Sequence, residues 1–173
     1  LGKCFTSVFN TIDYNKLTNF EVIYVDSNST DDSIAQANKF NNVRTFKITG
    51  KYNAAIARNI GAKEAVGDVF FFIDGDMQIC ADFLPLVYDE KQGLFDDFVS
   101  GNFININYDN DWNFIDKEDY LKLRQDKLQF TTGGLFLIKS KIWYQFGGMK
   151  NKLRRNQDVD FALRLARMGI LLN

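Results

Sequence analysis

Residues 69–77 read VFFFIDGDM, an apolar run that breaks abruptly into two aspartates, Asp74 and Asp76, separated by one glycine. The run has the length and composition of a buried strand, typical of parallel sheets that are covered on both faces. Ligands bind at the carboxyl ends of such strands, where these two side chains are expected. Two carboxylates there can hold Mg²⁺ or Mn²⁺, which prefer oxygen ligands and leave positions open for phosphates. The alternative interpretation is an ordinary Asp-Gly turn.

The sequence before this strand alternates between helix and strand patterns. Apolar spacing and capping residues predict helices over residues 1–12, 29–40 and 53–65, and strands over residues 20–25 and 43–48. Helices between successive strands imply right-handed crossovers and an α/β fold with a mainly parallel sheet. The carboxyl ends of parallel strands meet at one edge, so we expect Asp26 to share an edge with Asp74.

The second half is less regular. We predict a helix over residues 81–90 with Pro85 in its first turn, a strand over 98–106 and a polar loop over 107–113. Further helices are predicted over 116–125 and 157–168, and a short strand over 170–172. Apolar residues over 128–138 flank Thr132, Gly133 and Gly134.

Composition limits the function classes. The 173 residues carry a net charge of −1, so the phosphate-neutralising surface that nucleic-acid binding requires is missing. No apolar stretch approaches the roughly 20 residues that cross a bilayer. The sequence has no histidine, and Cys4 and Cys80 form no metal-binding pattern. We expect one domain over residues 1–173 in a reducing compartment.

Several polar residues outside the strand end could serve the same site. Asp26 and Ser27 open a polar loop before a predicted helix, which suits a nucleotide or is simply a capped turn at Asn28. Arg58 could contact a diphosphate, although an arginine on such a helix is usually solvated. Asp158 could act as a general base, or it could be an ordinary acid in the first turn of a helix.

Aromatic residues offer a further kind of binding surface. Flat rings pack well against the C–H faces of sugars, and four residues of the second half are candidates: Tyr108, Trp112, Trp143 and Tyr144. Most aromatic side chains belong to the core, so only an exposed cluster would support this interpretation.

Six segments, taken in order, carry a resemblance to a known family. They are EVIYVDSNSTDDS, ARNIGA, FFFIDGDM, TGGLFLIKS, FGGM and QDVDFALRLARMG. Their order and spacing resemble the family 2 glycosyltransferases of the GT-A fold. The resemblance implies inverting transfer of a sugar from a nucleoside-diphosphate donor, with uridine diphosphate favoured, to a hydroxyl of a glycan, lipid-linked or protein acceptor. A role in polysaccharide or glycoconjugate synthesis is also implied.

The resemblance also implies roles for residues. Asp26 and Ser27 would contact the nucleoside, and Lys51, Arg58 and Asn59 would border the nucleotide. Asp74 and Asp76 would form a DXD motif at the metal, in which Asp74 would bind the ribose or a metal-bound water and Asp76 would ligate the cation. Asp158 would be the catalytic base. Thr132, Gly133, Gly134 and Gln157 would lie on the acceptor side. Residues 1–100 would form a nucleotide-binding half and residues 101–173 an acceptor half.

The sequence departs from the family pattern in two places. Gln157 stands where the family usually has a glutamate, which makes the surroundings of Asp158 less negative and that carboxyl easier to ionise. The family's first strand would precede Leu1, and without it we expect a gap between the Asp26 strand and the Asp74 strand. We therefore interpret the chain as a fragment, and expect a cytoplasmic protein that reaches the membrane surface only through segments outside residues 1–173.

Two other functions remain open at this point. The chain could be a catalytically silent module that binds sugar nucleotides, as the absent first strand and Gln157 suggest. It could also be a phosphatase of the haloacid dehalogenase class, which likewise places two acids after an apolar strand. Gln78 stands where that class has a hydroxyl residue.

Overall fold

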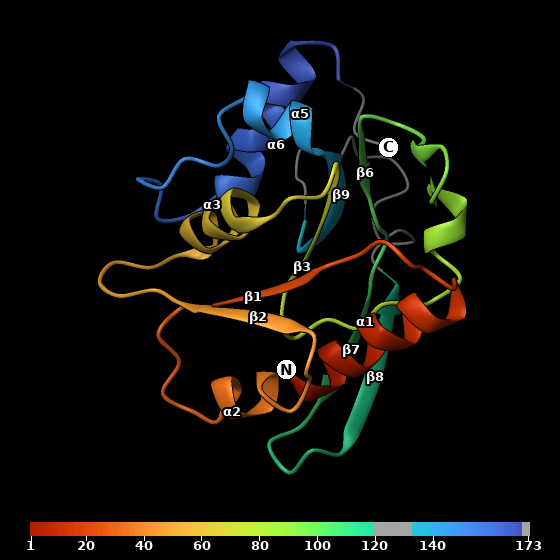
Figure 1. Ribbon diagram of the computed structural model, residues 1–173. Coiled ribbons are helices and arrows are strands. Elements are labelled where there is room, and N and C mark those ends of the chain that lie inside the picture. Colours follow the sequence, from red (N-terminus) through yellow and green to blue (C-terminus); the bar gives the residue numbers. More distant parts are fainter. Residues whose placement is uncertain (120–132, 171–173) are drawn as a thin grey trace.

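The computed structural model describes residues 1–119 and 133–170 and has a mixed α/β architecture (Figure 1). The helices are α1 (Gly2–Tyr14), α2 (Ser33–Ala37), α3 (Ala54–Glu64), α5 (Ser140–Gln145) and α6 (Gln157–Arg167), with one 3₁₀ turn, η1 (Leu84–Leu86). The strands are β1 (Val22–Asp26), β2 (Val43–Lys47), β3 (Val69–Ile73), β4 (Tyr88–Asp89), β5 (Gly93–Leu94), β6 (Phe98–Ser100), β7 (Ile104–Tyr108), β8 (Phe114–Asp119) and β9 (Leu135–Lys139).

The main strands form two sheets. β1 and β2 are parallel, from Val22 opposite Val43 to Asp26 opposite Lys47. β9 lies between β3 and β6 and is antiparallel to both, so the prediction of a mainly parallel sheet holds for β1 and β2 but is wrong for the second sheet. The direction of β9 is set by its pairing with β3 and β6, which are distant in sequence, so no local pattern predicts it. Among the described strands β1 and β3 belong to different sheets, in agreement with the expected gap.

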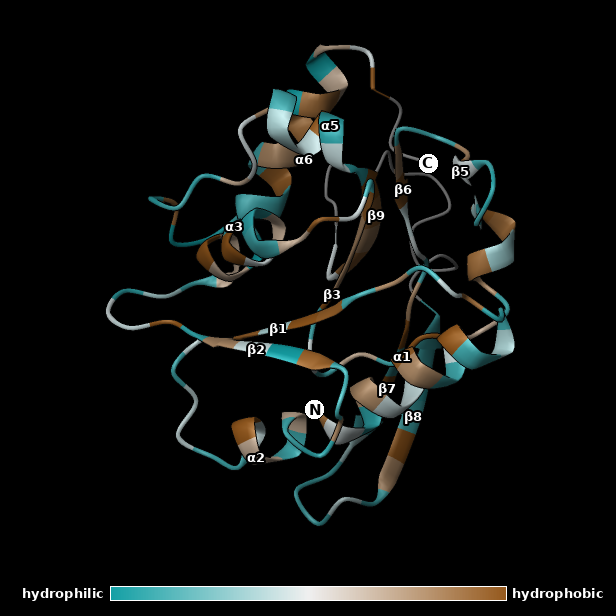
Figure 2. Ribbon diagram, in the orientation of Figure 1, coloured by the Kyte–Doolittle hydropathy of each residue, from teal (hydrophilic) through white to brown (hydrophobic). Residues whose placement is uncertain are grey.

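β9 organises the core because both of its faces are buried. Phe136 and Ile138 pack in one cluster with residues of α3, α5 and α6, whereas Leu137 faces a second cluster around η1. This alternation is the two-residue period of a strand. Trp143 of α5 fills the space beside it, with ring centroids 4.7 Å from Phe72 and 4.9 Å from Phe161. Figure 2 shows the apolar strands β3, β6 and β9 together at the centre of the molecule.

The first half follows the predicted pattern closely. α1, β1, β2, α3 and β3 lie where apolar spacing placed them, and the Asn53 side chain caps α3 by accepting a hydrogen bond from the Ile56 N–H at 2.9 Å. α2 is shorter than predicted, because it begins at Ser33 after Asp32 and not at Ser29 or Thr30.

The second half departs from the predictions at several points. The predicted helix over 81–90 is wrong, since Pro85 lies in a single 3₁₀ turn and a tight turn with Gly93 at φ +77° joins β4 to β5. Residues 116–119 belong to β8 and not to a helix, because pairing with β7 keeps them extended. The predicted strand over 98–106 is interrupted between β6 and β7, and α5 was not predicted.

Parts of other predictions lie outside the described residues. These parts are residues 120–125 of the predicted helix over 116–125, residues 128–132 with Thr132, and residues 171–172 of the short strand. The final helix is confirmed as α6. None of the helices within 1–119 and 133–170 combines the length and the apolar character that crossing a bilayer requires.

Candidate active site

Asp74 lies directly after β3 and is fixed by two contacts. Its backbone N–H donates to the Gly134 carbonyl at 2.9 Å, which continues the β3–β9 pairing. Its Oδ1 accepts a hydrogen bond from Arg58 Nη2 at 2.6 Å. The Arg58 side chain is only 11% exposed, and its guanidinium lies over the Phe136 ring at 5.9 Å from the centroid. Arg58 is therefore a nearly buried cation held against Asp74 and not a solvated helix arginine.

Burial and the neighbouring charges together raise the pKa of the Asp74 carboxyl. Burial raises the pKa of this carboxyl above its usual range, Arg58 lowers it, and the charges of Asp76 and Asp158 raise it again. The effects that raise the pKa together exceed the effect of Arg58, so the ionised form of Asp74 is less favourable in the folded chain than in water. Asp158 consequently shares one electrostatic environment with Asp74 and Asp76 although it comes from a distant part of the sequence.

The oxygen chemistry of these side chains suits a hard divalent cation. Asp76 is exposed, and the Asp74 side chain is partly desolvated but still 48% exposed. A cation would relieve the repulsion from Asp76 and Asp158 that adds to the effect of burial on the pKa of Asp74. Within the described ranges, no three carboxylate or thiol groups are close enough to form a metal site by themselves. Asp74 and Asp76 could thus supply only part of the coordination, which leaves room for water and for phosphate oxygens.

Gly134 packs against the Asp74 carboxylate. A Cβ atom at this glycine would lie 2.6 Å from Asp74 Oδ2 and 2.9 Å from Met77 Sδ, so any larger residue would force the Asp74 and Met77 side chains to shift. The neighbouring Gly133 has φ +65°, a conformation that favours glycine. Of the predicted acceptor-side residues, Gly134 contacts Asp74, Gly133 lies near Ser100, and Thr132 lies outside the described residues.

Asp26 has a different environment from the other acids. Its side chain is 0% exposed, and its two carboxylate oxygens accept hydrogen bonds from the Tyr24 hydroxyl at 3.0 Å and the Ser29 N–H at 3.1 Å. Burial alone raises its pKa, but the hydrogen bonds from Ser29 and Tyr24 and the charge of Lys47 lower the pKa below its usual range. A ligand could reach this carboxylate only by displacing Tyr24 or Ser29. The loop also contains the turn at Asn28, with φ +62°.

Helix α1 contacts both segments that follow β1 and β3, a feature that the sequence did not reveal. The Leu1 side chain lies 3.1 Å from where a Cβ of Gly75 would be, and Cys4 Sγ is 3.8 Å from the Asp74 carbonyl oxygen. On the other side, Gly2 lies beside Gln36 of α2. Aromatic contacts of Phe5 and Phe9 with Phe40 hold the helix there.

Asn59 joins α3 to the loop before α6. Its side chain donates to the Met149 carbonyl and to Asn151 Oδ1, both at 2.7 Å, and accepts from the Met149 N–H at 3.0 Å. Its amide group is therefore occupied by protein partners. Lys51, another predicted nucleotide contact, is exposed in the loop between β2 and α3.

The first turn of α6 holds Asp158 half-buried, next to Gln157, whose side chain donates to the Leu153 carbonyl at 2.8 Å. The helix is tied to the preceding loop by Arg164, which donates to Asp160 Oδ2 at 2.9 Å and to the carbonyls of Phe146 and Gly148. Asp160 and Arg164 are four residues apart on α6, and the two carbonyl contacts of Arg164 orient the helix.

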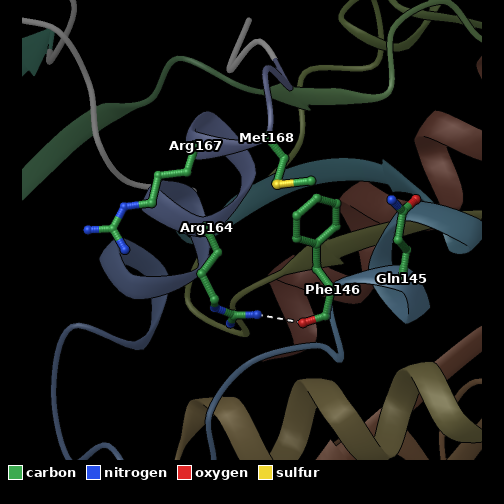
Figure 3. A pocket seen from close by; sticks show the side chains of 5 residues that line it. All are labelled: Gln145, Phe146, Arg164, Arg167 and Met168. Carbon is green, nitrogen blue, oxygen red and sulfur yellow. Dashed lines mark hydrogen bonds between the residues drawn. The ribbon is translucent and has the colours of Figure 1, made fainter.

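A pocket lies at the other end of α6 from Asp158. It is lined by Gln145, Phe146, Arg164, Arg167 and Met168. Figure 3 shows Arg164 bonded to the Phe146 carbonyl within it, while the Phe146 ring and Met168 form the apolar side. Its position at the end of α6 away from Asp158 separates it from the cluster of aspartates.

Comparisons of sequence point to one family. The family model described as "Glycosyl transferase family 2" matches residues 1–161. Glycosyltransferase GlyG of Streptococcus pneumoniae serotype 4 is 33% identical over 100 residues, which are 56% of this chain and 33% of that protein. An uncharacterised glycosyltransferase of Haemophilus influenzae is 26% identical over 159 residues, 86% of this chain and 52% of that protein. The chain thus spans about a third and about half of the lengths of these relatives.

Comparisons of structure support the same fold. The mannosyltransferase PcManGT from Pyrobaculum calidifontis, in complex with GDP-Man and Mn²⁺, superposes with a TM-score of 0.61 at 18% identity, over 96% of this chain and 50% of that one. GalNAc-T7 with UDP, GalNAc and Mn²⁺ superposes with a TM-score of 0.59 at 16% identity, over 88% of this chain and 35% of that one. These likenesses confirm a GT-A-like α/β fold.

Proposed function

This chain belongs to glycosyl transferase family 2, and on that premise we propose that it takes part in inverting transfer of a sugar from a nucleoside-diphosphate donor to an acceptor hydroxyl. We favour a uridine diphosphate donor, and a glycan, lipid-linked or protein acceptor in polysaccharide or glycoconjugate synthesis. The solved structures that the fold resembles contain GDP-Man or UDP together with Mn²⁺, which supports a nucleoside-diphosphate donor and a divalent cation for this chain.

The observation that carries the proposal is the position of Asp74. This carboxylate is paired with a nearly buried Arg58 and lies in the field of Asp76 and Asp158. Such an arrangement of unlike charges, open to solvent at Asp74 and Asp76, fits a diphosphate and its cation better than it fits a structural ion pair. Asp76 and Asp74 would hold Mg²⁺ or Mn²⁺, which neutralises the negative charge that develops on the departing diphosphate.

Asp158 is the proposed base. As the acceptor oxygen bonds to the anomeric carbon, the bond from that carbon to the diphosphate oxygen breaks and its electron pair leaves with the diphosphate. The proton of the acceptor hydroxyl passes to the Asp158 carboxylate. The Gln157 side chain beside it donates a hydrogen bond to the Leu153 carbonyl, which fixes the start of the helix.

Binding of nucleotides is the first test. The melting temperature is measured with UDP, GDP and dTDP, each with and without Mn²⁺. We expect one nucleotide to raise the melting temperature, and to do so only when Mn²⁺ is present. Asp76→Ala should abolish that rise. Asp13→Ala, an exposed aspartate of α1, is the matched control and should preserve it. An equal shift for Asp76→Ala and the parent chain would contradict the metal role.

Turnover is the second test, and it separates transfer from silent binding. Asp158→Asn should retain metal-dependent nucleotide binding and lose sugar transfer, because an amide cannot accept the proton. Transfer at the normal rate by this variant would show that the base is another residue. The silent-module alternative keeps the gap between β1 and β3 as its support, and it would be identified by binding without turnover in the parent chain. The phosphatase alternative has no support in the family to which the chain belongs.

A further inference from the structure

The outer end of the β7–β8 hairpin carries an exposed cluster of aromatic side chains. Tyr108 is 48% exposed, Trp112 83% and Phe114 61%. The ring centroids of Trp112 and Phe114 lie 6.4 Å and 6.5 Å from that of Tyr108. We call these three residues the aromatic tip. Single exposed apolar side chains are common on proteins, but a contiguous group of rings marks an interaction site.

The hairpin turn holds Trp112 in a costly conformation. Its φ is +64°, a left-handed backbone that bulky residues rarely adopt. The turn is kept in place by Asp109, whose Oδ1 accepts hydrogen bonds from the Asp111 and Asn113 N–H groups, each at 2.9 Å. The fold thus stabilises a strained backbone that places a large ring in water, and packing within the described residues does not account for this.

The apolar surface continues from the aromatic tip along one face of the hairpin. Ile104 and Ile106 are 45% and 50% exposed and share one face of β7, because alternate residues of a strand point the same way. The pairing with β8 shifts register between Asn107 and Tyr108, at the start of the aromatic tip. Asn105 and Asn107 point to the opposite face. Figure 2 shows an apolar stretch of β8 at the outer end of the hairpin, away from the apolar centre of the molecule.

The charge around the aromatic tip restricts what can bind there. The residues 109–119 include Asp109, Asp111, Asp116, Glu118 and Asp119 but only one cation, Lys117. This negative surface repels anionic lipids and nucleic acids. Its carboxylates and the nearby asparagine amides are instead good partners for hydroxyl groups. Flat rings beside such groups suit a neutral saccharide, whose C–H faces pack on aromatic surfaces.

The hairpin starts next to the candidate active site. β6 ends at Ser100, which pairs with Phe136, and the Gly101 N–H donates to the Leu135 carbonyl at 3.3 Å. The preceding residue, Gly134, contacts Asp74. β7 begins three residues after Gly101, at Ile104, and itself extends roughly 14 Å at about 3.4 Å per residue. A chain of sugars could therefore reach from the aspartates to the aromatic tip.

We propose that the aromatic tip binds the part of a neutral acceptor saccharide that lies away from the reacting hydroxyl. This inference rests on the proposed sugar transfer and adds a second contact region for the same substrate. Of the four aromatic candidates in the sequence, Tyr108 and Trp112 belong to this region. Trp143 is buried, and the Tyr144 hydroxyl donates to the Ala62 carbonyl at 2.6 Å.

Acrylamide quenching of tryptophan fluorescence tests the proposal directly. Trp143 is 2% exposed, so the quenchable emission comes from Trp112, which is 83% exposed. The probes are four neutral tetrasaccharides, each built from a single sugar: glucose, galactose, mannose or N-acetylglucosamine. At least one of them should protect the exposed emission from quenching. Calorimetry then measures the affinity for the tetrasaccharide that protects. Trp112→Ala should lower this affinity at least about tenfold, and Trp112→Phe should restore the affinity because a ring remains. Tyr14→Ala, another exposed aromatic at 64%, should bind like the parent chain.

Other outcomes overturn the proposal. It is wrong if no tetrasaccharide protects Trp112 at the highest soluble concentration, if only phosphatidylglycerol vesicles protect it, or if protection merely follows protein concentration. Mn²⁺-dependent nucleotide binding is measured on the same parent sample. Intact nucleotide binding without protection rejects the aromatic tip alone, whereas protection without nucleotide binding rejects the proposed function alone.

Discussion

At the scale of single residues, the pair of Arg58 and Asp74 determines how the site responds to pH. Arg58 lowers the pKa of Asp74, while burial and the charges of Asp76 and Asp158 raise it. A cation binds the ionised carboxylate, so its affinity increases as the pH rises through the pKa of Asp74. Any change that removes the guanidinium therefore moves this transition to higher pH.

Arg58→Gln tests this directly. We expect nucleotide binding with Mn²⁺ to weaken about 10- to 100-fold, the size of a lost charged hydrogen bond, and its midpoint to shift to higher pH. Calorimetric titrations across a pH series measure both effects. Arg44→Gln is the control, because that arginine forms a surface pair with Glu21 and is 47% exposed. An unchanged or lowered midpoint in Arg58→Gln would contradict the assignment.

The two cysteines should differ in reactivity. Burial raises the pKa of Cys4 to about 11, whereas Cys80 is exposed. At pH 8 only about one Cys4 in a thousand would be a thiolate, the form that reacts. We expect iodoacetamide to modify the native chain at Cys80 first, as peptide mass mapping would show. Equal rates at both positions would mean that α1 does not stay packed beside Asp74.

At the scale of secondary-structure elements, two glycines lead to opposite predictions. Gly134 directly precedes β9, and a Cβ at this position would lie 2.6 Å from Asp74 Oδ2. Gly134→Ala should therefore displace Asp74, reduce metal-dependent nucleotide binding and lower the free energy of unfolding by about 1–3 kcal/mol. In α3, a Cβ at Gly61 would meet Val25 at an ordinary 3.7 Å, so Gly61→Ala should stabilise by roughly 0.5–1 kcal/mol. Urea denaturation of both variants measures the difference. Equal effects would contradict the close packing at Gly134.

Elements with local signals were predictable from the sequence, and elements set by distant partners were not. α3 has its cap and strand β3 its apolar run, so each is encoded within a few residues. β8 is extended because β7 pairs with it, and β9 runs antiparallel because of its neighbours β3 and β6, which no local pattern reveals. For the same reason the grouping of Asp74 with Arg58 was foreseen only in part, and the role of Asn59 in joining α3 to the loop at Met149 was missed.

At the scale of the whole molecule, stability should fall in acid. The folded pKa values of Asp26 and Asp160 lie below their usual range. Each carboxylate therefore contributes stability that is present above its unfolded pKa, near 3.8, and is lost as the pH falls through the lower folded value. Asp74 acts in the opposite sense, because its raised pKa makes ionisation unfavourable in the folded chain.

Asp26→Asn checks this account. It should lower the free energy of unfolding at pH 7 by about 1–3 kcal/mol, because the bonds to Tyr24 and Ser29 lose their charged acceptor. It should also make stability less dependent on pH below 4, since one titrating group is gone. Urea titrations from pH 7 to pH 3 supply both quantities. A variant that keeps the full acid sensitivity of the parent chain would show that Asp26 is not a source of it.

The nearly buried guanidinium of Arg58 has one more consequence. Its side chain is already immobilised by Asp74 and by the Phe136 ring before any donor arrives. Ordering a long, flexible side chain on binding costs about 0.5–1.5 kcal/mol, and here folding has met that cost in advance. A diphosphate entering this site would therefore exchange one rigid partner of the arginine for another, and recognition would begin from a preorganised donor group.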